Sequence, residues 1–156
     1  MRKGVSRQME KGFQGFTLLE MLLVVALIAI LASIVIFAIN PAKQLAQARN
    51  AQRRTDVNTI LNAIYQYSLD NQGQLPGDIP LDTSLEICQT DASSCTGLVD
   101  LGALTLDEEY LTAVPQDPNG ACTTNSVCYG VHQSANGRIT VEALYAELGE
   151  SITVTR

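Results

Sequence analysis

Residues 16–39 read FTLLEMLLVVALIAILASIVIFAI, and this stretch decides how the chain is organised. It contains no Lys, Arg, Asp, Gly or Pro, and Glu20 is its one charged residue. As an α-helix it would be about 36 Å long, enough to cross a hydrocarbon core of about 30 Å. A helix that is apolar on all sides lies in lipid or deep inside a protein, and a chain of this size is too small to cover such a helix. We therefore expect residues 16–39 to insert into a membrane.

The charge of the chain changes along its length. Residues 1–15 carry a net charge of +3 and residues 40–71 a net charge of +2. Residues 72–156 hold twelve acidic residues and two arginines, within a total charge of −6 over 156 residues. Because basic residues before a span are retained in the cytoplasm, we expect a cytoplasmic N-terminus and an extracytoplasmic C-terminal region. The sequence carries no specific nucleic-acid signal, since phosphate affinity depends mainly on Lys and Arg.

A secretory signal peptide is the main alternative for the apolar stretch. Such a peptide has an apolar core of about 7–15 residues followed by a small-residue cleavage site. The core here is longer and continues into Asn40-Pro41-Ala42-Lys43, without an Ala-x-Ala pattern. We therefore expect the span to stay in the mature protein.

Glu20 lies about one turn inside the apolar stretch, where an ionised carboxylate costs about 2.5–3.5 kcal/mol in a bilayer. The alternative is that Glu20 lies near the lipid headgroups, where it costs little. Residues 11–20, KGFQGFTLLE, together with the apolar run after them, resemble the type IV pilin and type II secretion pseudopilin family. The resemblance is strong over residues 11–40. Further along, the chain matches that family in general layout, with a proline-rich turn at residues 115–120 that resembles one group of pseudopilins.

The resemblance implies how the N-terminus is processed. A prepilin peptidase would remove residues 1–15 by cutting between Gly15 and Phe16, and would methylate the new amino group of Phe16. A cut after Gly12 is the alternative, but it would not place Glu20 fifth in the mature chain, where the family has its acid. Physically, the Phe16 ammonium of one copy and Glu20 of another form a charge pair that fixes one register between sliding apolar helices. We therefore interpret Phe16 and Glu20 as the filament assembly site.

The residues after Asn40-Pro41 predict an amphipathic helix that ends near residues 70–73. With the apolar stretch it would make one helix of about 80 Å from Phe16 to Leu69, bent or locally opened near residue 40. Several major pilins have a proline midway along the apolar helix, and this chain has none before Pro41, so the site of any melting in a filament stays open. The expected apolar face of the second half comprises Leu45, Ala48, Val57, Ile60, Leu61, Ile64 and Tyr67. The arginines at 49, 53 and 54 are expected on a solvated face or paired with acids of a neighbouring subunit.

The strand signals come late in the chain. Residues 127–133 and 138–145 flank Ser134-Ala135-Asn136-Gly137, a hairpin turn signal, and residues 151–155 predict a third strand. Residues 74–104 are expected to be irregular, and Thr105-x-x-Glu108 predicts a capping box that opens a short helix to Leu111. The fold class is therefore α+β: a long N-terminal helix packed on a small antiparallel sheet. Its segments are a leader (1–15), an apolar helix (16–39), an amphipathic helix (40–71) and a head (72–156).

Four cysteines lie beyond the span and none before it, which indicates disulfides on the oxidising side of the membrane. We favour the pairs Cys88–Cys95 and Cys122–Cys128 because both close short loops. A longer link such as Cys95–Cys122 stays open, and a zinc site is disfavoured because no Cys-x-x-Cys spacing occurs.

We expect no cofactor, with calcium as the alternative. Some related pseudopilins brace their heads with calcium, and the oxygen donors available here are Asp107, Glu108, Glu109 and Asp117. Acidic residues in a head also serve solubility alone, and no EF-hand spacing occurs in the sequence.

The resemblance implies a structural subunit of a type IV pilus or related filament, and not an enzyme. Its partners would be copies of itself, the prepilin peptidase and the assembly machinery; it would be a single-pass membrane protein first and part of a cell-surface filament afterwards. The alternatives are a minor pilin that serves as an adhesin tip and a type II secretion pseudopilin. A membrane-tethered extracytoplasmic enzyme or sensor is a remote alternative, because no Gly-x-Ser-x-Gly, Walker or zinc-protease pattern occurs and His132, the one histidine, has no obvious partner.

Overall fold

The computed structural model describes residues 15–120 and 122–156. They form two long helices, two short 3-10 turns and a four-stranded sheet. The chain divides into two compact units, of which the first ends at Pro41 and the second comprises Ala42–Arg156. The α+β prediction of a long apolar helix and a helix packed on an antiparallel sheet is confirmed. Apart from Gly15, the predicted leader lies outside the described residues.

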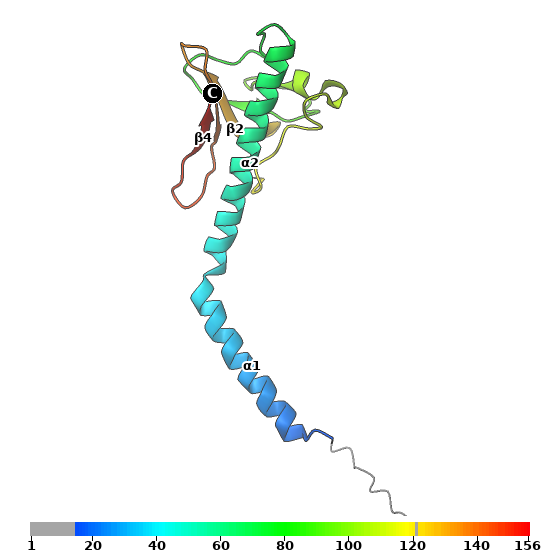
Figure 1. Ribbon diagram of the computed structural model, residues 1–156, viewed down its shortest axis with the longest axis vertical. Helices are drawn as coiled ribbons and strands as arrows, with labels where there is room; N and C mark the ends of the chain where they lie inside the picture. The colour runs from blue at the N-terminus through cyan, green and yellow to red at the C-terminus, as the bar shows by residue number, and fades with distance from the viewer. Residues whose placement is uncertain (1–14, 121) are drawn as a thin grey trace, which may run out of the picture. The chain divides into compact units, whose positions relative to one another are not determined.

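The opening predicted near residue 40 of the long helix is confirmed, and at that point the structure divides the helix into two. Helix α1 spans Leu18–Ile39 and helix α2 spans Pro41–Asp70 (Figure 1). Asn40, between them, has a left-handed backbone with φ of 43°. Proline has no N–H to donate and its ring clashes with the carbonyl four residues earlier, so the hydrogen-bond ladder of α1 does not continue through Pro41. Asparagine is one of the few residues other than glycine that tolerate the left-handed region.

The predicted end of the second helix is confirmed. Helix α2 stops at Asp70, and the Gly73 N–H donates to the Ser68 carbonyl at 2.7 Å. Gly73 has φ of +87°, which a residue without a Cβ adopts at no steric cost. The backbone N–H of Asn71 donates to the Tyr67 carbonyl at 2.9 Å, so the last helical carbonyls find partners in the turn.

The sheet has four antiparallel strands in the order β1-β2-β3-β4. Three of them lie where the sequence predicts strands. Strand β1, residues Leu85–Cys88, lies inside the region that was expected to be irregular and pairs with β2, for example Glu86 with Gly130. The other three strands are β2 (Ser126–Gln133), β3 (Ile139–Ala143) and β4 (Ile152–Thr155).

The hairpin between β2 and β3 closes as the sequence predicts. The Ser134 N–H donates to the Arg138 carbonyl, and the Gly137 N–H donates to the Ser134 carbonyl, both at 2.8 Å. Gly137 has φ of +78°, so the glycine of the Asn-Gly pair supplies the backbone that the turn needs.

The core lies between α2 and one face of the sheet, which Figure 1 shows beside the upper part of the helix. The helix and the sheet both contribute fully buried side chains, namely Val57, Ile60, Leu61 and Ile64 from α2 and Val127, Tyr129, Val131 and Val141 from β2 and β3. The upper part of the predicted apolar face is thus confirmed. Its lower part is wrong, because Leu45 and Ala48 are exposed and the helix instead buries Ala46, Asn50 and Arg53.

The predicted helix from Thr105 to Leu111 is also wrong. Residues Gly102–Leu104 and Leu106–Glu108 form two 3-10 turns, η1 and η2. The Thr105 hydroxyl donates to the Gly102 carbonyl at 3.1 Å and accepts no capping hydrogen bond from the next turn. Asp107 has a left-handed backbone with φ of 53°, which ends helical geometry after one turn.

Candidate assembly site

Thr17 caps helix α1 and brings Glu20 into its first turn. The Thr17 backbone is extended, with φ of −79° and ψ of 151°, and its hydroxyl accepts a hydrogen bond from the Glu20 N–H at 3.2 Å. Glu20 is therefore the third residue of the helix, where a carboxylate faces the positive end of the helix dipole and gains about 0.3–1 kcal/mol. This second role of Glu20 was not predicted, although Thr17-x-x-Glu20 has the capping-box spacing.

The predicted cleavage bond lies just outside the helix. Gly15 and Phe16 precede the cap in non-helical backbone, and 79% of Phe16 is exposed. Among the residues that the structure describes, no atom lies within 4 Å of the position that a Cβ on Gly15 would take. Non-helical backbone with open space beside the glycine is a form that a peptidase can bind.

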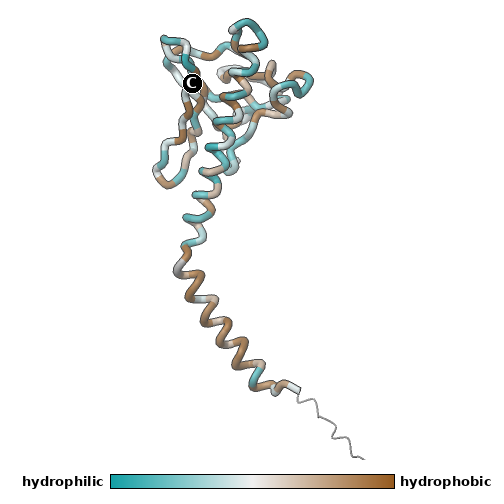
Figure 2. Tube along the Cα trace, in the orientation of Figure 1, coloured by the Kyte–Doolittle hydropathy of each residue, from teal (hydrophilic) through white to brown (hydrophobic). Residues whose placement is uncertain are grey.

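The surface of α1 is apolar on all sides. Residues Leu18–Phe37 have a mean hydropathy of 2.9, and none of the helix residues in this span is buried within the described chain. Figure 2 shows the contrast with α2, where polar and apolar residues mix. The Ser33 hydroxyl donates to the Ala29 carbonyl of its own helix at 2.8 Å, so this polar group does not need a partner from outside. With 22 residues, α1 is long enough to cross a membrane.

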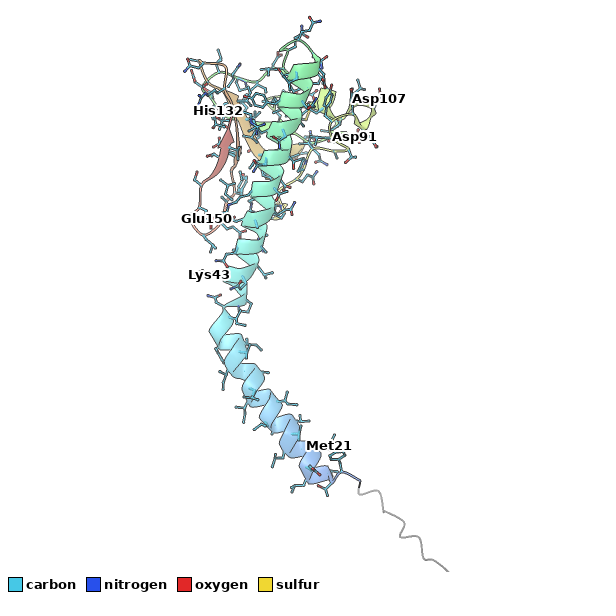
Figure 3. All side chains as sticks on the ribbon, in the orientation of Figure 1. Met21, Lys43, Asp91, Asp107, His132 and Glu150 are labelled. Atoms are coloured by element: carbon cyan, nitrogen blue, oxygen red, sulfur yellow. A yellow bond between two sulfur atoms is a disulfide. The ribbon has the colours of Figure 1, made fainter. Side chains whose placement is uncertain are left out.

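Glu20 is the one charged residue of α1. Among residues 15–120 and 122–156 the structure has four ion pairs, and none of them includes Glu20. The candidate assembly site therefore consists of the exposed apolar surface of α1 and the Glu20 carboxylate near its N-terminal end. Figure 3 shows the neighbouring Met21 among side chains that project from the helix.

Comparison with protein families identifies this N-terminal segment. Residues 11–38 match the family model described as the prokaryotic N-terminal methylation motif. The chain carries the motif that is the hallmark of type IV pilins and pseudopilins. It is therefore a pilin- or pseudopilin-like protein, and the motif together with the apolar α1 fits a membrane-anchored precursor. No significant match was found among curated proteins or among solved structures.

In this pilin-like chain the methylation motif ends at residue 38, and the head has its own polar site on α2. Arg53 is fully buried, which corrects the prediction of a solvated face. Its guanidinium donates to both carboxylate oxygens of Asp117, at 2.6 Å and 2.9 Å, in a pair whose side chains are both fully buried. It also donates to Asn50 and Glu147, each at 2.9 Å.

Glu147 connects the same part of α2 to the loop between β3 and β4. Arg49 donates to both of its carboxylate oxygens, at 2.7 Å and 2.6 Å. The side chain of Asn50 donates to the Glu147 carbonyl and accepts from the Glu147 N–H, at 2.8 Å and 3.0 Å. The hydrogen bonds from Arg49 and then Arg53 lower the pKa of Glu147 to about 2. This loop is therefore fixed to the helix through both its side chain and its backbone.

All three arginines at positions 49–54 pair with acids of their own chain. Arg54 pairs with Glu150, the fourth ion pair, in a partly exposed position. Above this cluster the Tyr129 hydroxyl donates to Asp56 at 2.7 Å, and burial together with that carboxylate raises the pKa of Tyr129. Pairing with acids of a neighbouring subunit, one of the two roles expected for the cluster, is not needed to satisfy these arginines.

Two disulfides hold the ends of strands β1 and β2. The structure joins Cys88 to Cys95 and Cys122 to Cys128, which are the pairs favoured from their short loops. Cys88 ends β1 and Cys128 lies in β2, and both are buried. A Cys95–Cys122 link would need another pairing of these sulfurs, and a zinc site would need them as thiolates instead of disulfides.

The four oxygen donors named for calcium do not gather in one place. Asp117 is buried against Arg53, whereas Asp107, Glu108 and Glu109 are exposed in and after η2. In the part of the chain that the structure describes, no group of three or more Asp, Glu, His or Cys side chains is placed to hold a metal ion. Calcium binding stays a prediction, and the donors left for it are the exposed residues Asp107, Glu108 and Glu109.

Proposed function

We propose that this chain is a structural subunit of a type IV pilus or related filament, which assembles by stacking the α1 helices of many copies. The observation that carries the proposal is the exposed apolar surface of α1, with a single carboxylate in its first turn, inside a methylation motif. Removing such a surface from water is favourable, and in lipid apolar helices associate through van der Waals packing. A surface that is apolar on all sides favours no single register. The Glu20 carboxylate would select one register between the packed α1 helices of neighbouring copies.

Cleavage between Gly15 and Phe16 creates an ammonium one helical turn before Glu20. In a low-dielectric bundle of apolar helices each of these charges is costly alone, and pairing them between copies offsets part of both costs. The contact joins two different surfaces of the subunit, so its repetition produces an open helical fibre and not a closed ring. The assembly machinery would add one copy at a time from the membrane.

The membrane orientation follows from charge. The basic residues before the span stay in the cytoplasm with the prepilin peptidase, and the acidic head is translocated. Two disulfides in the head fit an oxidising compartment on that side. The head then faces the exterior, first on the membrane and later along the filament.

Intact-mass analysis of protein sheared from cells tests the proposal. We expect the mass of residues 16–156 with one methyl group and two disulfides. Gly15→Leu should block processing and leave the chain in the membrane, whereas Gly12→Leu, at the competing glycine, should be processed normally. A full-length mass in sheared filaments, or a mature chain that begins at Phe13, would overturn the assignment of Gly15 and Phe16.

The amount of protein in the sheared material separates a bulk subunit from an adhesin tip. We expect the chain to be a main component, because α1 needs no partner other than its own copies. If it is present in trace amounts beside another abundant pilin, the tip role holds instead.

A further inference from the structure

A cavity of about 350 Å³ opens where the end of α2 meets the segment that contains η2. Small-ligand sites have volumes of about 300–1,000 Å³. The residues that give this cavity its character are two tyrosines and three acids, namely Tyr67, Asp70, Asp107, Glu109 and Tyr110. Figure 3 labels Asp107 on the loop at this edge of the head. The cavity belongs to the second unit and takes no part in the assembly site on α1.

The cavity is electrically negative. Its described lining includes three carboxylates and no Lys or Arg. It also adjoins the C-terminal end of α2, which carries a partial negative charge and has no basic residue in its last turn. Partial burial, followed by the nearby Glu109 and Asp70 carboxylates, raises the pKa of Tyr110. Like charges gathered in this way repel one another, and a bound cation would relieve the repulsion.

The two tyrosines add aromatic faces to this negative field. The rings of Tyr67 and Tyr110 lie with centroids 5.5 Å apart and an interplanar angle of 67°, an edge-to-face pair. Both tyrosines pack partly against the core, both are only half-buried, and both line the cavity. An uncovered aromatic face attracts a cation that approaches within about 6 Å of the ring centroid.

The spacing of the acids favours binding of an organic cation over coordination of a metal ion. No three of the described acids are close enough together to coordinate a metal. An alkylammonium ion is larger, is weakly hydrated, and needs aromatic contact and nearby negative charge instead of direct coordination. We propose that the cavity formed by Tyr67, Asp70, Asp107, Glu109 and Tyr110 binds a small organic ammonium ion.

Choline is a suitable probe, with the uncharged isostere 3,3-dimethyl-1-butanol as its control. The full chain would be titrated in a maltoside detergent, since phosphocholine detergents would compete, and followed by isothermal titration calorimetry and the NMR signals of the tyrosine rings. We expect saturable binding of choline that shifts the Tyr67 and Tyr110 signals. The isostere should bind at least about tenfold more weakly, since it lacks the charge.

Three variants locate the site. Tyr110→Leu, which removes the ring, and Glu109→Gln, an exposed position where folding is not at risk, should each weaken choline binding roughly threefold to tenfold. Tyr110→Phe keeps the ring and should retain most of the binding. Tyr145→Leu and Glu86→Gln change a tyrosine and a glutamate that do not line the cavity, and should bind choline like the wild type.

Three results would overturn the proposal: choline and its isostere binding equally, the control variants losing as much affinity as Glu109→Gln, or calcium binding at these acids while choline does not bind. Each can be obtained whether or not the chain forms filaments, so the outcome is independent of the assembly role.

Discussion

Glu20 in α1 and Asp117 in the head are two carboxylates that differ in where their partners lie. Asp117 is fully buried and meets Arg53 through two hydrogen bonds within its own chain. Glu20 lies on an apolar helix, and the described chain offers it no ion-pair partner. A buried charge that is satisfied internally stabilises one fold, whereas a charge left without an internal partner is available to fix contacts between molecules.

The largest effect should come from removing the unpaired charge. Glu20→Ala would remove one partner of the charge pair that we propose between filament subunits, so assembly should fall by about a hundredfold or more. The stability of the head in detergent should not change, because Glu20 takes no part in the core. Electron microscopy and quantification of sheared protein measure the first effect, and urea denaturation measures the second.

Ser33→Ala is the matched control on the same helix. Its hydroxyl bonds only to Ala29 of its own turn, so the variant should assemble normally. Normal filaments from Glu20→Ala would break the comparison, since the carboxylate would then have no assembly role.

At Arg53 we expect the opposite result, a loss of head stability caused by breaking an ion pair within the chain. Arg53→Met leaves Asp117 as a buried charge without its guanidinium, and should lower the free energy of unfolding of the head by about 3–5 kcal/mol. Arg54→Met, one residue further along, breaks a partly exposed pair and should cost no more than about 1 kcal/mol. Urea denaturation of the full chain in detergent compares the two.

A second replacement sharpens this test. Arg53→Met combined with Asp117→Leu removes both buried charges and should recover part of the lost stability, since apolar groups can replace a buried pair. Equal losses for Arg53→Met and Arg54→Met would show that burial of Arg53 contributes little.

A smaller loss of stability is expected when a disulfide of the head is removed. Replacing Cys122 and Cys128 by Ala opens a short loop and should cost about 2–3 kcal/mol in the free energy of unfolding. The helical content of α1 in detergent should be unchanged, because all four cysteines lie in the second unit. A loss of α1 helicity in the double variant would contradict the separation of the two units.

The smallest expected effect is the pH dependence that Glu147 gives to the stability of the head. Its pKa is lowered to about 2 in the folded chain by Arg49 and Arg53, from an ordinary value of 4.5. The stability it contributes is therefore present above pH 4.5 and is lost as the pH falls from there toward 2. Urea midpoints at pH 7 and pH 3 should differ more for the wild type than for Glu147→Gln. Equal differences would mean that Glu147 is not held by these arginines.

The sequence predicts the parts of this fold that depend on local patterns. The uniform apolar run from Phe16 to Ile39 predicts α1, and Asn136-Gly137 predicts the β2–β3 hairpin. Strand β1 was missed because it has only four residues and its partner β2 lies about 40 residues further along the chain. Its strand character depends on pairing and not on a pattern of its own.

At Arg53 and at Thr105, local sequence patterns predict the wrong structure. Arg53 was assigned to solvent because arginine is charged, yet Asp117, 64 residues away, makes its burial favourable. The capping-box spacing occurs at both Thr17-x-x-Glu20 and Thr105-x-x-Glu108, and of these two threonines only Thr17 caps a helix. An apolar run of 22 residues follows Thr17 and propagates the first turn, whereas Thr105 is followed by the left-handed backbone of Asp107.

The position of Glu20 inside an assembled filament tests the central claim most directly. A cryo-electron microscopy reconstruction that resolves side chains would give the distance from the Glu20 carboxylate to the Phe16 amine of each copy. We predict that the closest amine belongs to another copy and lies within hydrogen-bonding distance. A Glu20 carboxylate that faces water, or that pairs only with the amine of its own chain, would contradict this account.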